Sequence, residues 1–398
     1  MSDIPSFADV GHDEAVRRAR ELAPFLRERV VLSESGRITP PEIMDELHRS
    51  GLLRSLQPKR WGGMELGIVA AFDIAYELAR GCASTSWTAV NILIHHWMLA
   101  LYEEKGQEWI WAQDRNACIA SGVAAAQGQA RIVEGGFMVS GRWNFSSAVT
   151  VSDWNMLAVT VRDDSNKVVD HRLCLLHKSE YEIVDDWHVL GMRSTGSHTV
   201  VTKDVFVPTW RASCMYKTRG GDHPGAAVNP GALYRVALPM LAGHIIGAVL
   251  VGNAQAALEQ TIASVKERST NYTGVRMRDI QAIQIRVGAA GARIETARRV
   301  IRGEFLEAQQ LADRFEVPDL ETKLRCKRDV AYAVSLCNEA VDILHAMAGA
   351  NGIYDAYPIQ RIFRDAHTGS SHFLFGSDLQ FSTWGLLALG GEVANPLL

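Results

Sequence analysis

Histidines and cysteines are the first candidates for chemistry in this chain. His95 and His96 are adjacent in a stretch with helical spacing, so their side chains point to different faces. His367 and His372 are five residues apart, which also separates them on a helix. The six cysteines are scattered without a CxxC pair, which fits a reducing cytosol and argues against a disulfide framework or a structural zinc site. We therefore expect no metal site.

The common catalytic and nucleotide-binding motifs are absent from the sequence. It contains no P-loop, no HExxH and no GxSxG elbow. No glycine-rich turn lies between a strand and a helix with an acidic residue downstream, so a Rossmann site for a nicotinamide cofactor is not expected.

Charge and composition exclude several classes of partner. The 398 residues are 47% hydrophobic and 22% charged, which is ordinary globular composition. The 41 basic and 45 acidic residues give a net charge of −4, without a basic surface for nucleic acid or an anionic membrane. The N-terminus has no basic segment followed by an apolar core, so no signal peptide is expected. These features predict a cytoplasmic protein.

The spacing of apolar residues divides the chain into three sections. The helices and strands of these sections must hold the side chains of any functional site in place. Residues 1–114 show helical spacing, residues 115–225 consist of short β-rich runs separated by turns, and residues 226–398 return to helical spacing. The middle section predicts a small barrel or sandwich. The clearest helical runs are 41–47, 68–80, 85–102, 276–304 and 323–348, and the clearest β-runs are 137–141, 156–161 and 173–176.

The most apolar stretch covers residues 236–251. Pro239 and His244 interrupt it, and it is shorter than the roughly 18–20 residues that a membrane span needs. We interpret it as a helix buried in a bundle.

Three segments, in this order, resemble the acyl-CoA dehydrogenase superfamily. They are LLRSLQPKRWGG (52–63) with ELARGCAST (77–85), then Glu267-Arg268 with Tyr272-Thr273-Gly274 and DIQAIQ (279–284), and finally AGANGIY (348–354) with Pro358 and IFRDA (362–366). The second and third segments resemble the flavin-binding motifs of that family. The resemblance implies flavin contacts at Arg268, Gln281, Gly349 and Gly352, with the Arg268 guanidinium on a pyrophosphate.

The resemblance also implies an architecture. The fold class is α+β, mostly α, with an N-terminal helical domain (1–114), a central β-barrel (115–225) and a C-terminal four-helix bundle (226–398). Members of the superfamily are usually homotetramers, so a homotetramer is expected here.

One departure from the dehydrogenase pattern bears on the reaction. The dehydrogenases carry a catalytic glutamate in a YEGTxxxQ segment just after RDA. Here the segment reads LFGSDLQ (374–380), and Phe375 stands where the glutamate would be. A phenyl ring cannot abstract a proton. Because some dehydrogenases place the base on another helix, an acyl-CoA dehydrogenase or related flavin oxidoreductase remains the alternative, and a non-catalytic oligomeric protein a third possibility.

The segment GRWNFSS (141–147), Trp154, His95 and His372 together resemble the oxygenase component of two-component flavin-dependent monooxygenases, such as p-hydroxyphenylacetate hydroxylase and indole-acetate monooxygenase. This resemblance implies hydroxylation of a small aromatic substrate, of phenol or indole type, through a C4a-hydroperoxyflavin. The cofactor would be reduced flavin (FADH2 or FMNH2) with O2, and a separate NAD(P)H:flavin reductase would supply the flavin. The missing nicotinamide fingerprint agrees with this division of labour.

The oxygenase resemblance assigns the flavin side of the site to one short segment. A hydroxyl at flavin N5 can hold the N5 proton in place, and Ser146 is the first candidate, with Ser147 second. Trp143 or Phe145 would flank the isoalloxazine ring. Without the motif, both aromatic residues would be interpreted as barrel core.

The two catalytic histidines have separate expected duties. An imidazole that titrates near neutrality can protonate the distal peroxide oxygen, and the resemblance places His372 there. His95 lies on the substrate side, where it would orient or deprotonate a phenol or bind an indole N–H. The adjacent His96 is the alternative candidate for this substrate-side role, and His95 is preferred.

Overall fold

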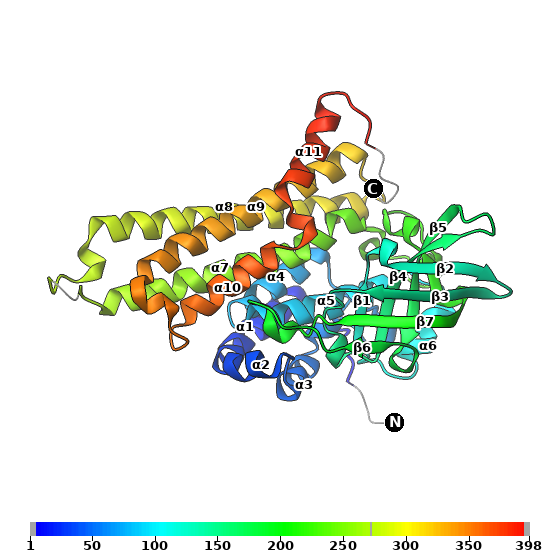
Figure 1. Cartoon of the computed structure of the whole chain (residues 1–398), viewed down its shortest axis with the longest axis horizontal. Helices are drawn as coiled ribbons and strands as arrows, with labels where there is room; N and C mark the ends of the chain where they lie inside the picture. The colour runs from blue at the N-terminus through cyan, green and yellow to red at the C-terminus, as the bar shows by residue number, and fades with distance from the viewer. Residues whose placement is uncertain (1–4, 271–272, 394–398) are drawn as a thin grey trace.

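The computed structural model describes residues 5–270 and 273–393, so Tyr272 of the expected flavin motif lies outside the described residues. Figure 1 shows three parts along the long axis of the molecule: a bundle of long helices at one end, a sheet at the other, and the N-terminal helices between them. The order of elements is helical, then β, then helical. This order agrees with the expected α+β fold, in which a helical part, a β part and a second helical part follow one another.

Six helices form the N-terminal part. They are α1 (His12–Glu28), α2 (Val30–Gly36), α3 (Pro41–Ser50), α4 (Ile68–Ala79), α5 (Ala83–Leu99) and α6 (Glu104–Trp111). The helical runs expected at 41–47, 68–80 and 85–102 correspond to α3, α4 and α5. Every residue of α5 except Asn91 is buried, because this helix packs against α4, α7 and strand β1 (Ile119–Gly122) at the junction of the three parts.

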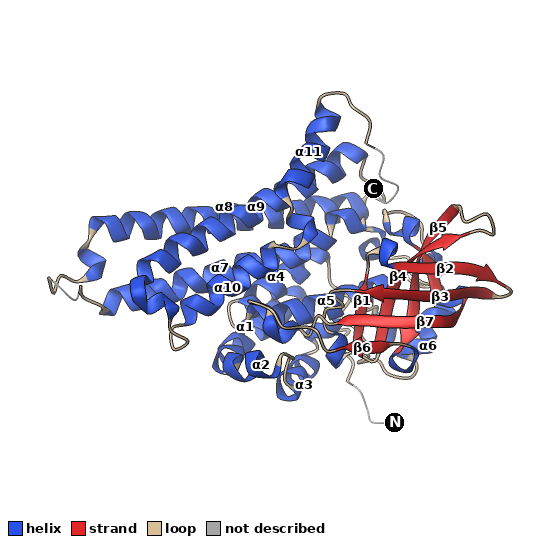
Figure 2. Ribbon diagram, viewed as in Figure 1, coloured by secondary structure: helices blue, strands red, loops and turns tan. Residues whose placement is uncertain are grey.

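The middle part is a mixed eight-stranded sheet, drawn in red in Figure 2. Its main path runs β6-β7-β3-β2-β4-β5-β8, and β1 pairs with β4 in parallel. The remaining strands are β2 (Gly128–Val133), β3 (Gly136–Trp143), β4 (Trp154–Arg162), β5 (Val168–His177), β6 (Glu182–Val184), β7 (Thr199–Pro208) and β8 (Ala212–Cys214). The expected runs at 137–141, 156–161 and 173–176 lie in β3, β4 and β5.

The C-terminal part is built from four long antiparallel helices and a fifth that projects from them (Figure 1). They are α7 (Ala242–Glu267), α8 (Gln281–Asp313), α9 (Leu320–Ala348), α10 (Pro358–Ser370) and α11 (Ser377–Ala388). The expected helix at 276–304 begins five residues later, at Gln281. Arg276 instead pairs with Ser269 in a β-bridge, and Met277–Asp279 forms a 3-10 turn.

Helix α7 is long and apolar enough to cross a membrane by length and composition. The segment Leu238–Glu267 has a window of mean hydropathy 1.5, and 83% of that window is buried inside the protein. Its neighbours are α4, α5, α8, α9 and α10. This is the buried bundle helix that the sequence predicts, although the α-helix begins only at Ala242, after a 3-10 turn at Leu238–Met240 that contains Pro239.

Candidate active site

A cavity of about 450 Å³ lies where α5, the loops of the sheet and the end of α10 meet. Its lining is aromatic and hydroxyl-rich. The aromatic members are Trp87, Phe145, Trp187 and Phe373, and the hydroxyl or amide members are Asn91, Ser121, Gln127, Asn144, Ser147, Thr195, Ser197, Thr368 and Ser371. His372 is the one ionisable side chain among the lining residues that the structure describes. The cavity therefore offers flat apolar faces, hydroxyl groups and a single imidazole.

A chain of hydroxyl groups crosses the wall of the cavity. The Ser147 hydroxyl accepts a hydrogen bond from Trp87 Nε1 at 3.1 Å and lies 2.9 Å from the Ser197 hydroxyl. Ser197 is in turn 2.7 Å from the Thr195 hydroxyl, which donates to the carbonyl of Met192 at 3.0 Å. The Ser147 hydroxyl is thus held in position from two sides.

Ser146 points away from the cavity, into the sheet. Its side chain is fully buried, and its hydroxyl accepts a hydrogen bond from Asn155 Nδ2 at 3.0 Å. Its backbone N–H donates to the carbonyl of His198 at 3.0 Å. Of the two serines that the sequence singles out, the structure brings Ser147 and not Ser146 to the cavity.

The two aromatic candidates for flavin contacts, Trp143 and Phe145, also lie in different places. Trp143 is 0% exposed in the sheet interior, where its indole Nε1 donates to the carbonyl of Ala158 at 2.7 Å. A Cβ added at Gly128 or Gly141 would lie 2.3 or 2.5 Å from the indole, so these glycines make room for the ring. Trp143 is therefore core and does not line the cavity.

Phe145, in contrast, lies at the surface of the cavity. It is 69% exposed, lines the cavity and faces Trp187 edge-on with 6.2 Å between ring centroids. Its φ of 63° is in the left-handed region, which costs a non-glycine residue about 1–3 kcal/mol. Backbone strain of this kind is commonly found at ligand sites.

His372 is held by the short turn that follows α10. Its Nδ1 accepts a hydrogen bond from the backbone N–H of Leu374 at 3.3 Å, so the proton of the neutral ring lies on Nε2. The ring packs against Trp87, Phe373 and Phe375. Burial lowers the pKa of His372 to about 4. Contrary to the expectation of an imidazole that titrates near neutrality, the ring is a neutral Nε2–H donor at pH 7.

His95 lies on the face of α5 that is directed to the cavity. Trp87, Asn91 and His95 are spaced i, i+4 and i+8, so they share one helix face, and the first two line the cavity. His95 Nδ1 lies 2.6 Å from the carbonyl of Ile119 on β1, and burial lowers its pKa to about 4. His95 itself is not among the lining residues. It lies one turn further along the face.

His96 lies on another face of α5. Its ring stacks on Trp111 with 5.8 Å between centroids, and its Nδ1 accepts a hydrogen bond from Trp111 Nε1 at 3.0 Å. This contact orients His96 into the N-terminal core and away from the cavity face.

Two residues of the RDA segment hold the loop that forms one wall of the cavity. Asp365 Oδ1 accepts a hydrogen bond of 2.6 Å from the backbone N–H of Met192. Arg364 donates to the carbonyl of Leu190 at 2.8 Å and pairs with Glu34 at 2.9 Å. The sequence reasoning did not assign these roles, because each contact joins residues more than 150 positions apart.

The sequence and the fold of this chain are similar to those of known proteins. Acyl-CoA dehydrogenase N-terminal and C-terminal domain families match residues 13–111 and 244–376. A flavin-dependent monooxygenase, oxygenase subunit HsaA, from Rhodococcus jostii (strain RHA1) is 32% identical over 384 residues, which cover 96% of this chain and 100% of the relative. The chain belongs to the oxygenase subunits of flavin-dependent monooxygenases.

Two further oxygenase relatives extend the comparison. The oxygenase component of p-hydroxyphenylacetate 3-hydroxylase from Acinetobacter baumannii is 28% identical over 387 residues, covering 96% of this chain and 91% of that one. The structure of XiaF from Streptomyces sp. in complex with FADH2 and glycerol matches with a TM-score of 0.88 at 25% identity, covering 97% of each chain.

The cavity fits the cofactor of an oxygenase subunit. Its volume is within the roughly 300–1,000 Å³ of small-molecule sites, and a flat isoalloxazine ring can stack on the aromatic side chains while its polar edge meets the Ser147 hydroxyl. Phe375, in the position of the dehydrogenase glutamate, is buried and 4% exposed. None of the lining residues that the structure describes carries a carboxylate, the group that serves the dehydrogenases as a base.

The other expected flavin contacts belong to the end of α7, the start of α8 and the α9–α10 connection, which lie at the end of the bundle away from the sheet (Figure 1). Ile246 lines the cavity, and Arg268 follows the last turn of the same helix, so the two are about 33 Å apart at 1.5 Å per residue. Arg268 lines a separate cavity of about 70 Å³ with residues from the α9–α10 connection, the connection that contains Gly349 and Gly352. Gln281 is the exposed first residue of α8.

Proposed function

We propose that this oxygenase hydroxylates a small aromatic substrate, of phenol or indole type, in the 450 Å³ cavity. Reduced flavin, delivered by a separate NAD(P)H:flavin reductase, supplies the electrons that activate O2. The observation that carries the proposal is the lining of aromatic faces and hydroxyls with His372 as its one ionisable group among the described residues. A polar group that accepts or donates a proton belongs where oxygen is transferred, and apolar walls exclude water from that point.

Ser147 is the proposed hydroxyl at flavin N5. Its oxygen accepts from Trp87, and its neighbour Ser197 is close enough to exchange hydrogen bonds with it. A hydroxyl held in this way can keep a proton on N5 and so limit the loss of reducing equivalents as H2O2. The exposed ring of Phe145 is the proposed contact for the isoalloxazine face, in place of Trp143.

His372 is the proposed donor to the oxygen that is transferred. Since Leu374 N–H occupies Nδ1, Nε2–H is the proton that the ring can present to the cavity. His95 is the proposed substrate-side group. Its Nδ1 is directed to the carbonyl of Ile119, which leaves Nε2 to accept from a phenol hydroxyl or an indole N–H.

We also propose a homotetramer in which the far end of one bundle completes the cavity of a neighbouring subunit. Within one chain, Arg268 is too far from Ile246 for both to contact one flavin ring. A neighbour's Arg268, Gln281, Gly349 and Gly352 would then bind the rest of the cofactor, with the guanidinium on a pyrophosphate. The six free cysteines support a cytoplasmic location.

A substrate panel tests the reaction directly. The full-length protein is mixed with chemically reduced flavin and ¹⁸O2 in the presence of phenols, hydroxyphenylacetates, indole or indole acetate, and products are identified by mass. The expected result is one ¹⁸O atom in an aromatic product. As the control, anaerobic protein with bound oxidised flavin is mixed with saturated acyl-CoAs. Bleaching of the flavin there, with no labelled product from the panel, would contradict the proposal.

A further inference from the structure

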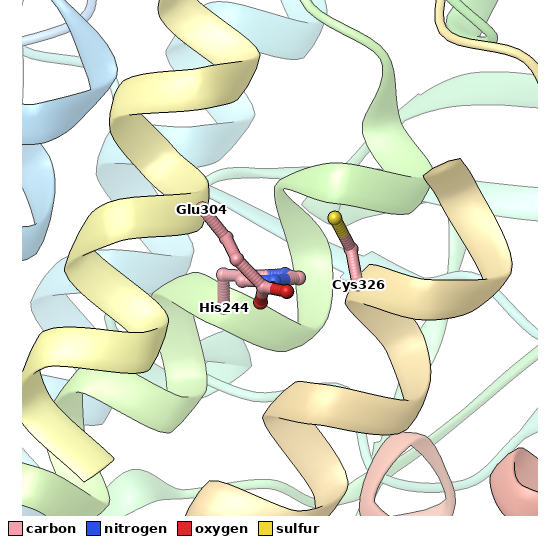
Figure 3. A group of neighbouring side chains, drawn as sticks. All are labelled: His244, Glu304 and Cys326. Atoms are coloured by element: carbon pink, nitrogen blue, oxygen red, sulfur yellow. The ribbon is translucent and has the colours of Figure 1, made fainter. Parts of the chain in front are cut away.

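A second cluster of ionisable side chains lies inside the four-helix bundle, outside the cavity. His244 comes from the first turn of α7, Glu304 from α8 and Cys326 from α9. His244 and Cys326 are 0% exposed and Glu304 is 6% exposed. Figure 3 shows the imidazole and the carboxylate meeting between α7 and α8, with the Cys326 side chain beside them on α9. One ligand atom from each residue lies within 4.8 Å of the others.

Only one of the two ring nitrogens of His244 has a hydrogen-bond partner among the described residues. Its Nε2 lies 2.7 Å from Glu304 Oε2, whereas its Nδ1 is buried with no hydrogen-bond partner among the described residues. Arg325 lies 3.5 Å from the other carboxylate oxygen of Glu304. An ion shared with Glu304 would take the Nε2 nitrogen, which faces the carboxylate, so the unpartnered Nδ1 lies outside the ligand set.

The set of donor atoms matches one chemical class of ligand. Imidazole nitrogen, carboxylate oxygen and cysteine sulfur are together the ligands of tetrahedral Zn²⁺, while hard ions such as Mg²⁺ and Ca²⁺ take oxygen ligands. A thiolate and a carboxylate also neutralise the two charges of the ion, which a buried cation requires. Ligand atoms around tetrahedral Zn²⁺ are about 3.5 Å apart, so the hydrogen-bonded pair of Nε2 and Oε2, at 2.7 Å, must separate slightly, and separations of up to 4.8 Å must shorten.

We propose that His244, Glu304 and Cys326 bind one Zn²⁺ ion that links α7, α8 and α9, with a water molecule as the fourth ligand. The site is structural. His244 is two residues from Ile246, which lines the cavity, so the ion stabilises the end of α7 that forms the cavity wall. This proposal differs from the expectation from sequence that the chain has no metal site. It does not depend on the proposed oxygenase chemistry.

Cobalt titration of the full-length protein, before flavin is added, tests the site. The protein is first dialysed against a chelator and then titrated with Co²⁺, a spectroscopic substitute for Zn²⁺. The expected result is one equivalent of Co²⁺ with the visible bands of a tetrahedral site and a near-ultraviolet thiolate-to-cobalt band, both removed by one equivalent of Zn²⁺. A wild-type protein that shows neither band at one equivalent overturns the proposal without any variant.

Matched cysteine variants locate the ion. Cys337 is on the same helix as Cys326, is 1% exposed and lies outside the cluster. Cys326→Ser should abolish the thiolate band and weaken Zn²⁺ binding about a hundredfold or more, since even outer partners of a metal contribute 10–100-fold. Cys337→Ser should leave both unchanged. If Cys326→Ser does not fold, His244→Gln takes its place, with loss of the tetrahedral bands expected. Retention of the wild-type spectrum in either cluster variant overturns the assignment.

Discussion

The indole N–H of Trp87 donates a hydrogen bond to the hydroxyl of Ser147 at 3.1 Å. The two residues belong to different parts of the fold, because Trp87 lies on helix α5 and Ser147 in the loop between strands β3 and β4. With the indole as donor and Ser197 on the other side, the orientation of the Ser147 hydroxyl is set by protein contacts before any ligand binds. Preorganised groups of this kind act on a ligand without a further cost of reorientation.

Ser147→Ala should therefore uncouple the enzyme, whereas Ser146→Ala should not. Removal of the Ser147 hydroxyl takes away the hydrogen bond at flavin N5, so H2O2 release should rise at the expense of product. Ser146→Ala loses a hydrogen bond with Asn155 and should lower stability by about 1 kcal/mol with coupling unchanged. Peroxide and product are measured in the same reactions. Uncoupling by Ser146→Ala alone would reverse the assignment.

The two histidine variants should differ in how many substrates they affect. His372→Ala should suppress product about 10²–10⁴-fold with every substrate, because it removes the only ionisable group among the described cavity residues. His95→Ala should raise the KM for phenols more than for indole, since a phenol must be oriented or ionised and an indole is already electron-rich. Steady-state kinetics over both classes checks this. Equal losses for all substrates in both variants would contradict separate duties.

The pH dependence follows from the buried environment of His372. Burial lowers its pKa to about 4 from the ordinary 6.5, so the folded protein keeps the ring neutral down to that pH. Protonation of Nδ1 would break the hydrogen bond from Leu374 N–H and release the ring. We expect the yield of product per flavin to stay constant from pH 8 to about pH 5 and to fall only below that. A loss of yield with a midpoint near pH 6.5 would show that the ring is solvated.

Asp365 should control flavin binding at a distance by holding the loop that contains Met192. Asp365→Ala leaves the buried Met192 N–H without an acceptor, at a cost of about 1–3 kcal/mol, and should weaken flavin binding and coupling. Asp365→Asn keeps an oxygen acceptor and should restore most of both. Flavin affinity by fluorescence, with unfolding midpoints recorded alongside, separates this positioning role from general destabilisation. Identical flavin affinity in wild type and Asp365→Ala would exclude it.

Mixed oligomers test whether one site draws on two subunits. His372→Ala and Arg268→Ala should each be inactive as pure proteins, the first in the cavity and the second at the far end of α7. If the two halves of each site come from different chains, random co-assembly restores about a quarter of the sites. The variants carry different tags, are co-expressed and are purified as mixtures. Activity that never exceeds that of the separate variants would place both halves in one chain.

Many helices and strands of this protein can be predicted from the spacing of apolar residues. The side-chain positions that cannot be predicted in this way have physical reasons. The periodicity of residues 323–348 and 137–141 predicts α9 and β3, because one face of each is buried. Local pattern cannot decide between Ser146 and Ser147, since that choice depends on which side of the loop meets α5. Trp143 is adjacent to polar residues in the motif, yet three-dimensional packing against Gly128 and Gly141 places it in the core.

The features that could not be predicted from the sequence are contacts between residues that are far apart in the chain. The His244, Glu304 and Cys326 cluster joins three helices, and its members are 60 and 22 positions apart in the sequence, so they form no short ligand motif that could be found there. The hydroxyl chain through Ser197 and the contact between Asp365 and Met192 likewise join distant segments. The stripe of Trp87, Asn91 and His95 is different, because its i, i+4, i+8 spacing was visible in the sequence and could have added Trp87 to the candidates.

The burial of α7 has a consequence for how the chain is made. Helices α4 and α5 are synthesised before this apolar helix, but α8, α9 and α10, which cover the rest of it, are synthesised after it. About a hundred further residues, up to the end of α10 at Ser370, must be added before α7 has all of its neighbours. During that interval the nascent chain displays a surface that chaperones, membranes and other nascent chains can bind. We therefore expect α7 to reach its final packing only after the last third of the chain has been elongated.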